Sequence, residues 1–110
     1  MARTVEDIRE RAVCFKIDRT WLPTLTEEQV SEKIRRAWVM NPHAHDPAIA
    51  LGIRQGKVIA VLRIEHWTQL DTGRWRFEGQ RDRNLEREYV GIDVTDLYGG
   101  SSNPVRYLNC

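Results

Sequence analysis

The stretch AIALGIRQGKVIAVLRIEHW, residues 48–67, contains two apolar runs on either side of a short polar turn, QGK. The runs are rich in Ile and Val, which favour strands, and a glycine in a two- or three-residue connection is typical of a tight turn. This stretch therefore predicts a β-hairpin with strands over residues 48–55 and 58–67.

The second strand of this hairpin changes character along its length. Strict alternation would place Val58, Ala60, Leu62 and Ile64 on one face. The other face is apolar in the first half of the strand and carries charges in the second half. Such a strand suits a small curled sheet or barrel from which it emerges at one end.

Outward from the hairpin, the chain alternates between further strands and one clear helix. Thr26 and Gln29 form a capping-box pattern, and the acidic residues that follow Thr26 suit the positive end of a helix, which we expect to reach Arg36. Residues 3–12 have a weak helical pattern, residues 80–88 predict either a solvated loop or a short helix, and residues 95–104 predict a turn-rich loop. The remaining predicted strands cover residues 12–17, 74–79 and 105–109.

This order predicts one α+β domain over residues 1–110, built on a small curled, mostly antiparallel sheet or barrel with one main helix. The length of 110 residues fits a single domain. No apolar run approaches the roughly 20 residues that span a bilayer, so we expect no membrane partner. The N-terminus has charges where a signal peptide is apolar, so we expect a cytoplasmic location with both cysteines, Cys14 and Cys110, as free thiols.

The charge balance gives no overall drive toward nucleic acid, because the net charge is +1. The basic residues are nevertheless unevenly divided, since only three of the 17 are lysines. Arginine binds phosphates and base edges with two parallel hydrogen bonds, which lysine cannot do. A GC-rich genome would give the same bias without any function.

Metal and catalytic motifs are poorly supported. His43, His45, Asp46 and His66 are the candidate metal ligands, but no further ligand stands at a diagnostic spacing, and we assign no metal or cofactor. The nucleophile elbow, the zinc-protease motif and the phosphate-binding loop do not occur. We therefore assign no catalytic residue, and we expect a protein that is not an enzyme.

The tryptophans are more informative. Trp38 ends the predicted helix and Trp67 ends the apolar strand, and both stand beside loops. Rings in such places either close the ends of a small core or form the walls of a pocket that holds a flat base. The sequence leaves both interpretations open.

The phrases CFKIDRTW, TEEQVSEKIRRAW, HDPAIALGI, GKVIAVLRIEHW and RWRFEG stand in this order between Val13 and Gly79. In pattern and order, this part of the chain resembles the PUA-like superfamily, and within it the EVE and YTH-type modules. The resemblance implies binding of RNA or DNA, with a base, including a modified one, held in an aromatic pocket. No third wall of the pocket can be assigned, the low net charge departs from the pattern of a nucleic-acid reader, and the segment from Tyr89 to Cys110 matches no motif of these modules.

Carried over to this chain, the resemblance makes Trp38 and Trp67 the two walls of the pocket and places Lys16 and Asp18 on its rim. We add Trp21, in the loop after the first strand, to the candidate ligand contacts. The candidate phosphate contacts are Arg35, Arg36, Arg81 and Arg83.

The function that follows from these expectations is a non-catalytic reader of nucleic acid or of a nucleotide. A protein-interaction or regulatory module and a small nucleotide-processing enzyme are the alternatives. The sequence leaves the oligomeric state open.

Overall fold

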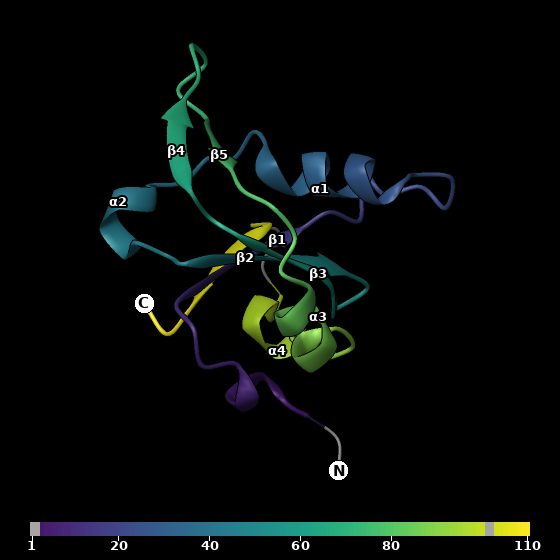
Figure 1. Ribbon diagram of the computed structural model, residues 1–110. Helices are drawn as coiled ribbons and strands as arrows, with labels where there is room; N and C mark the ends of the chain where they lie inside the picture. Colours follow the sequence, from purple (N-terminus) through teal and green to yellow (C-terminus); the bar gives the residue numbers. More distant parts are fainter. Residues whose placement is uncertain (1–2, 101–102) are drawn as a thin grey trace.

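A four-stranded mixed sheet forms the centre of the computed structural model, which describes residues 3–100 and 103–110, and a two-stranded hairpin stands above it (Figure 1). The α+β class is confirmed; the sheet is open and has one parallel pair of strands. The elements, in chain order, are η1 Val5–Asp7, β1 Ala12–Lys16, α1 Glu27–Arg35, α2 Pro42–His45, β2 Ile49–Arg54, β3 Lys57–Arg63, β4 His66–Gln69, β5 Trp75–Glu78, α3 Arg83–Tyr89, α4 Thr95–Tyr98 and β6 Val105–Leu108.

The strand order of the main sheet is β3-β2-β1-β6. β2 and β3 form the predicted antiparallel hairpin, and β6 pairs antiparallel with β1, as the predicted closing strand. β1 and β2 are parallel, with Ala12 opposite Ile49. Parallel neighbours need a long crossover connection. Here the crossover contains α1 and α2.

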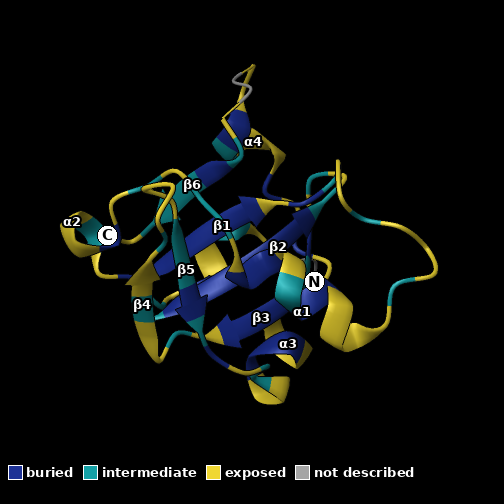
Figure 2. Ribbon diagram, turned by 90° about the horizontal axis from the view of Figure 1, so that it is seen from above, coloured by how far each residue is buried: buried dark blue, intermediate teal, exposed yellow. Residues whose placement is uncertain are grey.

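Both faces of the main sheet are covered (Figures 1 and 2). α3 and α4 pack on one face, over alternate residues of β1 and β2 that include Cys14 and Leu51. α1 and the β4–β5 hairpin pack on the other face, over Phe15 and Ala50. The central strands are therefore buried on both sides, which explains why the sequence of β2 and β3 is apolar with little alternation.

A β-bulge changes the predicted facing of β3. The pairing shifts between Gly52 and Ile53, so that Ile59 is the extra residue of the strand. Val58 consequently faces α3 and α4, whereas Ala60 and Leu62 face α1. The prediction that Val58 shares a face with the other two was wrong, because strict alternation does not anticipate the bulge.

α1 begins and ends as predicted. Thr26 caps it, since its hydroxyl accepts from the Gln29 N–H at 3.1 Å and its own N–H donates to the Gln29 side chain at 2.8 Å. The helix packs closely on β2 through Ile34, because a Cβ at Gly52 would lie only 2.4 Å from Ile34 Cδ1. Gly52 thus sets the depth at which α1 lies on the sheet.

The predicted strand over residues 58–67 is in fact two strands. β3 ends at Arg63, and β4 begins at His66 and pairs with β5 in a separate sheet. The backbone of Trp38 also pairs with that of Trp75, through two N–H···O bonds of 2.8 Å. The segment after α1 is thereby fixed beside the hairpin, and this is what positions the candidate site.

The short helices were only partly anticipated. α3 is the short helix that was one of the two alternatives for residues 80–88, and the weak helical pattern of residues 3–12 yields only η1. α4 lies in the segment over residues 95–104 that was predicted to be a turn-rich loop, of which residues 101–102 lie outside the described residues, and α2 follows α1 in the crossover.

Candidate base-binding cleft beside Trp38

Four aromatic rings contact one another in a row on the α1 side of the sheet. Trp38 stacks on Phe15, with ring centroids 4.5 Å apart and planes 13° from parallel. Phe15 stacks on Phe77 at 6.3 Å, and Phe77 contacts Trp67 at 5.3 Å. Both phenylalanines are fully buried, so they fix the positions of the half-buried indoles at the two ends.

This row corrects the prediction that Trp38 and Trp67 face each other across one pocket. Phe15 and Phe77 lie between the two indoles in the sequence of ring contacts. The sequence could not show this, because it places both tryptophans at element ends without revealing that two core rings separate them.

The Trp38 ring is held in one orientation. Its Nε1–H donates to the Ile34 carbonyl oxygen at 2.7 Å, at the last turn of α1. Its backbone is paired with β5, and one of its faces is covered by Phe15. An indole fixed in this way presents a rigid apolar surface to whatever enters beside it.

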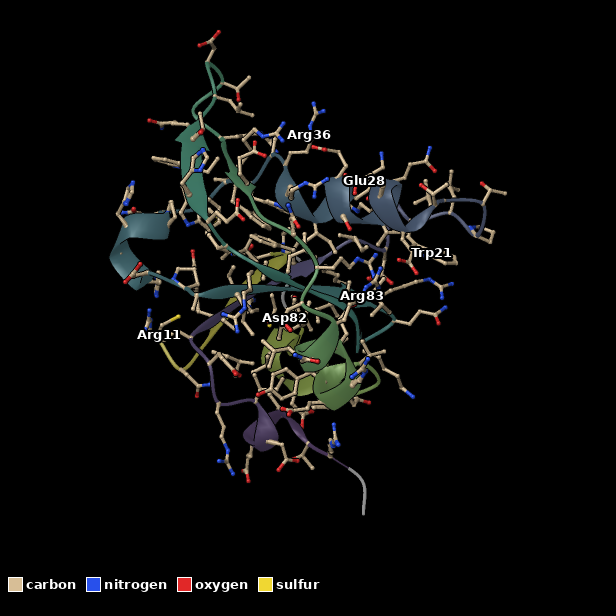
Figure 3. All side chains as sticks on the ribbon, in the orientation of Figure 1. Arg11, Trp21, Glu28, Arg36, Asp82 and Arg83 are labelled. Atoms are coloured by element: carbon tan, nitrogen blue, oxygen red, sulfur yellow. The ribbon has the colours of Figure 1, made fainter. Side chains whose placement is uncertain are left out.

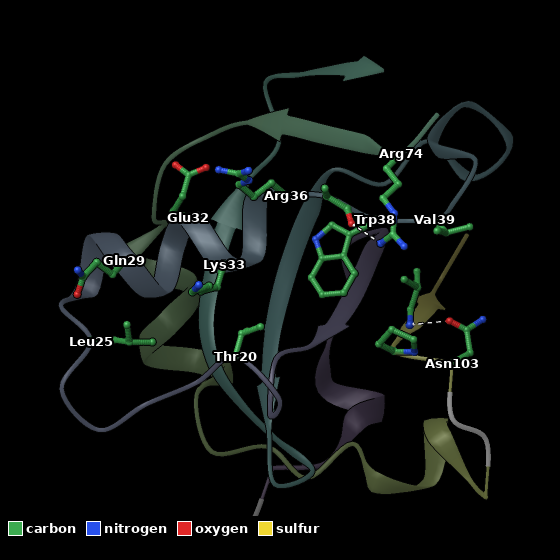
Figure 4. Close-up of a pocket in the computed structure, with 13 residues that line it drawn as sticks. Thr20, Leu25, Gln29, Glu32, Lys33, Arg36, Trp38, Val39, Arg74 and Asn103 are labelled. Carbon is green, nitrogen blue, oxygen red and sulfur yellow. Dashed lines mark hydrogen bonds between the residues drawn. The ribbon is translucent and has the colours of Figure 1, made fainter. Parts of the chain in front are cut away.

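A cleft opens beside this ring (Figure 4). We call it the Trp38 cleft, and it has two compartments. The first has a volume of about 810 Å³ and lies between α1, Trp38 and Pro104. The second has a volume of about 410 Å³ and lies at the end of β1, next to Lys16 and Asp18. Trp38 and Pro104, together with Thr20, line both compartments.

Five exposed cations line the Trp38 cleft. Lys33, Arg36 and Arg74 belong to the first compartment, and Lys16 and Arg19 belong to the second. The side chains of Lys33, Arg36 and Arg19 make no hydrogen bond or ion pair with any residue in the described ranges. Arg74 donates to the Ala37 carbonyl oxygen at 3.3 Å, and the Lys16 ammonium lies 5.7 Å from the Tyr98 ring.

Two carboxylates line the cleft, and one of them is paired with arginines. Glu32 pairs with Arg35 at 3.4 Å and with Arg76 at 3.4 Å. Asp18 accepts a hydrogen bond from the uncharged Gln55 N–H at 2.8 Å and keeps its negative charge, against the five cations. The charges left over in the cleft are therefore mainly positive, which favours an anionic ligand.

The other three predicted phosphate contacts, Arg35, Arg81 and Arg83, are not among the residues that line the cleft, and Figure 3 shows Arg83 beside α3, away from Arg36. Arg35 is buried, pairs with Glu28 and Glu32, and donates to the Gly79 carbonyl oxygen at 3.1 Å. Its burial lowers the pKa of the guanidinium, and the two ion pairs raise it by more, so that the net pKa lies above the ordinary value. Arg35 is therefore a structural cation, held in the charged state between α1 and the chain after β5.

Arg81 and Arg83 link α3 to α1 through hydrogen bonds and ion pairs. Arg81 donates to the Ser31 hydroxyl at 2.9 Å and pairs with Glu86 at 3.0 Å. Arg83 pairs with Glu27 and with Glu86. The hydrogen bond and the charge of Glu27 raise the pKa of Arg83, and the same pair lowers the pKa of Glu27.

Two predicted ring contacts also lie outside the residues that line the cleft. Trp21 is covered by Arg54, whose guanidinium carbon lies 3.6 Å from the ring centroid. Trp67 packs against Phe77 at the far end of the ring row. The structure thus brings together Trp38, Lys16, Asp18 and Arg36 from the predicted set, and it does not bring Trp21, Trp67, Arg35, Arg81 or Arg83 to them.

Helical periodicity would have revealed part of what was missed. Gln29 and Lys33 are spaced i, i+4 on α1 and both line the cleft, and Arg36 joins them from the extended residue that follows the helix. Arg35 falls on a different face, four residues after the buried Ser31. Arg74 and Arg19 come from loops, and nothing in their local sequence marks them.

The described residues contain neither a metal-binding cluster nor a membrane-spanning helix. Within residues 3–100 and 103–110, no three His, Cys, Asp or Glu side chains gather in a way that could hold a metal ion. None of the helices in the same ranges has the length and apolar character to cross a membrane. No protein-family model, curated protein or solved structure matches the chain.

Proposed function

We propose that this protein binds nucleic acid or a nucleotide, without catalysis, by stacking a base on the exposed face of Trp38. The observation that carries the proposal is a fixed indole in the wall of a cleft whose unpaired charges are positive. A cytoplasmic location is part of the same proposal.

Stacking supplies the base contact. One face of Trp38 rests on Phe15 at 4.5 Å, and the residue lines both compartments of the cleft. A base in contact with an aromatic side chain contributes about 1–3 kcal/mol of binding free energy. Because Nε1 is already bonded to Ile34, the ring loses little freedom when the base stacks on it.

The unpaired cations supply the phosphate contacts. The side chains of Lys33, on α1, and of Arg36, directly after it, are exposed, lack partners among the described residues and line the cleft. A phosphate would gain a charge-assisted hydrogen bond from each without breaking an existing ion pair. Phosphate contacts to Arg35 or Arg81 would instead disrupt pairs that stabilise the fold.

The test compares Trp38→Leu with Trp67→Leu in fluorescence anisotropy of a labelled, mixed-sequence, single-stranded oligonucleotide. Both indoles are half-buried and pack at the ends of the same ring row, so both variants should lose stability to a similar extent. Only Trp38→Leu should weaken binding, by about 5- to 150-fold. Equal weakening by both variants, or no binding by the parent protein to any nucleic acid or nucleotide, would refute the proposal.

A protein-interaction module is the second candidate, and it rests on two exposed apolar side chains. Leu22 is 57% exposed and Val39 is 70% exposed, and Val39 stands at the edge of the cleft. Single exposed apolar residues are common, however, and carry little weight by themselves. This candidate gains support if the parent protein binds no nucleic acid and Val39→Ser abolishes self-association in sedimentation velocity.

A further inference from the structure

We infer that the ligand of the Trp38 cleft is a continuous single strand that passes over Trp38, with one base stacked on the ring and phosphates bound on both sides of it. This inference rests on the proposed function and decides between a nucleic-acid strand and a free nucleotide. It also replaces the pocket with two tryptophan walls, expected from the sequence, by a single stacking surface.

Trp38 borders both compartments of the cleft. Thr20, Trp38 and Pro104 line each of them, so the indole is a wall common to the two. Pro104 is fixed there because its carbonyl oxygen accepts from the Lys16 N–H at 2.9 Å, which ties the wall of the cleft to the end of β1. A ligand that stacks on Trp38 can extend into both compartments.

The cations are divided between the two compartments. Lys33 and Arg36 line the first compartment only, and Lys16 and Arg19 line the second only. A mononucleotide has its phosphate on one side of its base and can satisfy one of these groups. A base inside a strand has a phosphate on each side and can satisfy both groups.

Within the part of the chain that the structure describes, Trp38 is not faced by a second aromatic ring across the cleft. It is the sole aromatic side chain among the described residues that line either compartment, and Trp67 lies at the other end of the ring row. A single stacking surface accepts any base, because every base has an apolar face, and recognition through hydrogen bonds is not required. We therefore expect weak base preference and no selection for a methylated base.

The first experiment measures binding of four probes at low salt: a nucleoside 5′-monophosphate, a single-stranded octanucleotide, the same octanucleotide with one N6-methyladenine, and its duplex. The single-stranded octanucleotide should bind at least about tenfold more tightly than the monophosphate and the duplex. The methylated strand should bind within about twofold of the unmethylated strand. Equal affinity for the monophosphate, tighter binding of the duplex, or a tenfold preference for the methylated strand would each overturn the inference.

The second experiment tests whether both compartments hold phosphates. The dependence of log Kd on log salt concentration is measured for Lys33→Gln/Arg36→Gln and for Lys16→Gln/Arg19→Gln. For single strands, each phosphate contact contributes about 0.7 to this slope, so each double variant should lower it by about 1.4. The matched control is Arg9→Gln/Arg87→Gln, two exposed arginines outside the cleft, which should leave the slope unchanged.

The outcomes separate the inference from the proposed function. If the salt slope falls only in the Lys33→Gln/Arg36→Gln variant and the monophosphate binds tightly, the ligand is not a continuous strand. The proposed stacking of a base on Trp38 would still stand. Absence of binding to all four probes would instead refute the proposed function. Melting temperatures within about 2 °C of the parent show that both double variants are folded, as expected for exposed side chains whose one contact is that of Lys16 with the Tyr98 ring.

Discussion

Arg35 and Arg36 are consecutive in the sequence, and the structure predicts opposite consequences for their replacement by glutamine. Both were candidate phosphate contacts. Arg35 is 10% exposed at its side chain and lies within a network of ion pairs, whereas Arg36 is exposed and has no partner among the described residues. Replacing each in turn by the same residue separates a structural cation from a binding cation.

The cost of Arg35→Gln follows from its partners. The Gly79 carbonyl oxygen loses a charged donor at 3.1 Å, and a hydrogen bond of this kind contributes about 1.5–3 kcal/mol. Glu28 is 78% exposed and is rehydrated at little cost, while Glu32 keeps Arg76 as a partner. We therefore expect a loss of about 2–3 kcal/mol, less than the cost of breaking a fully buried pair. Arg36→Gln should stay within about 0.5 kcal/mol of the parent.

Urea unfolding followed by circular dichroism measures these differences, and oligonucleotide anisotropy measures binding. For a domain of this size, 1 kcal/mol moves the melting temperature by roughly 4–8 °C, so Arg35→Gln should melt about 8–24 °C below the parent. Folded Arg35→Gln protein should bind the oligonucleotide like the parent, and Arg36→Gln should bind more weakly. If the two variants are similarly stable, the ion pairs of Arg35 contribute nothing to the free energy of unfolding. If Arg36→Gln binds the oligonucleotide like the parent, Arg36 is not part of the binding site.

Three further predictions concern the rest of the chain. The hydrogen bond from the Leu85 N–H lowers the pKa of Asp82 below 3.8. The ionised Asp82 carboxylate therefore stabilises the folded protein fully above pH 3.8, and this contribution is lost as the pH falls further. In unfolding curves measured below pH 3.8, the difference in stability between Asp82→Asn and the parent should shrink. Burial raises the pKa of Cys14 to about 12, so thiol titration of the native protein should detect only Cys110, and a second thiol should appear in denaturant. Gly56→Ala should destabilise the β2–β3 hairpin by more than about 1 kcal/mol in urea unfolding, since Gly56 has φ +76° and the new Cβ would meet a side-chain oxygen at 2.2 Å.

The elements that the sequence predicted well are those whose signals are local. The hairpin over residues 48–67 has an apolar run on each side of a glycine turn, and α1 has a capping box at Thr26 and Gln29. The parallel pairing of β1 and β2 has no local signal, because it depends on how the crossover through α1 and α2 packs. The bulge at Ile59 likewise has no local signal, because only the pairing of β3 with β2 determines which residue of β3 has no partner across the ladder.

The site was predicted less well because its residues come from distant segments. Trp38 and Arg36 were found from the end of a helix, and Lys16 and Asp18 from the end of a strand. The separation of Trp38 from Trp67 depends on two phenylalanines from different strands that fill the space between them. No spacing within one segment predicts such an arrangement.

The net charge of +1 is a poor guide to the ligand of this protein, and the ion pairs explain why. Glu27, Glu28 and Glu86 are taken up in pairs with Arg35, Arg81 and Arg83, in the region where α1 meets α3 and the chain after β5. Arginine suits these positions because its planar fork binds two acceptors at once, as Arg83 does between two glutamates. The bias toward arginine therefore has a structural use that needs no nucleic acid. At the Trp38 cleft itself, Glu32 is paired with Arg35 and Arg76, whereas the side chains of Lys33, Arg36 and Arg19 have no partner among the described residues. The local charge around the cleft, and not the sum over the chain, is what an anionic ligand would experience.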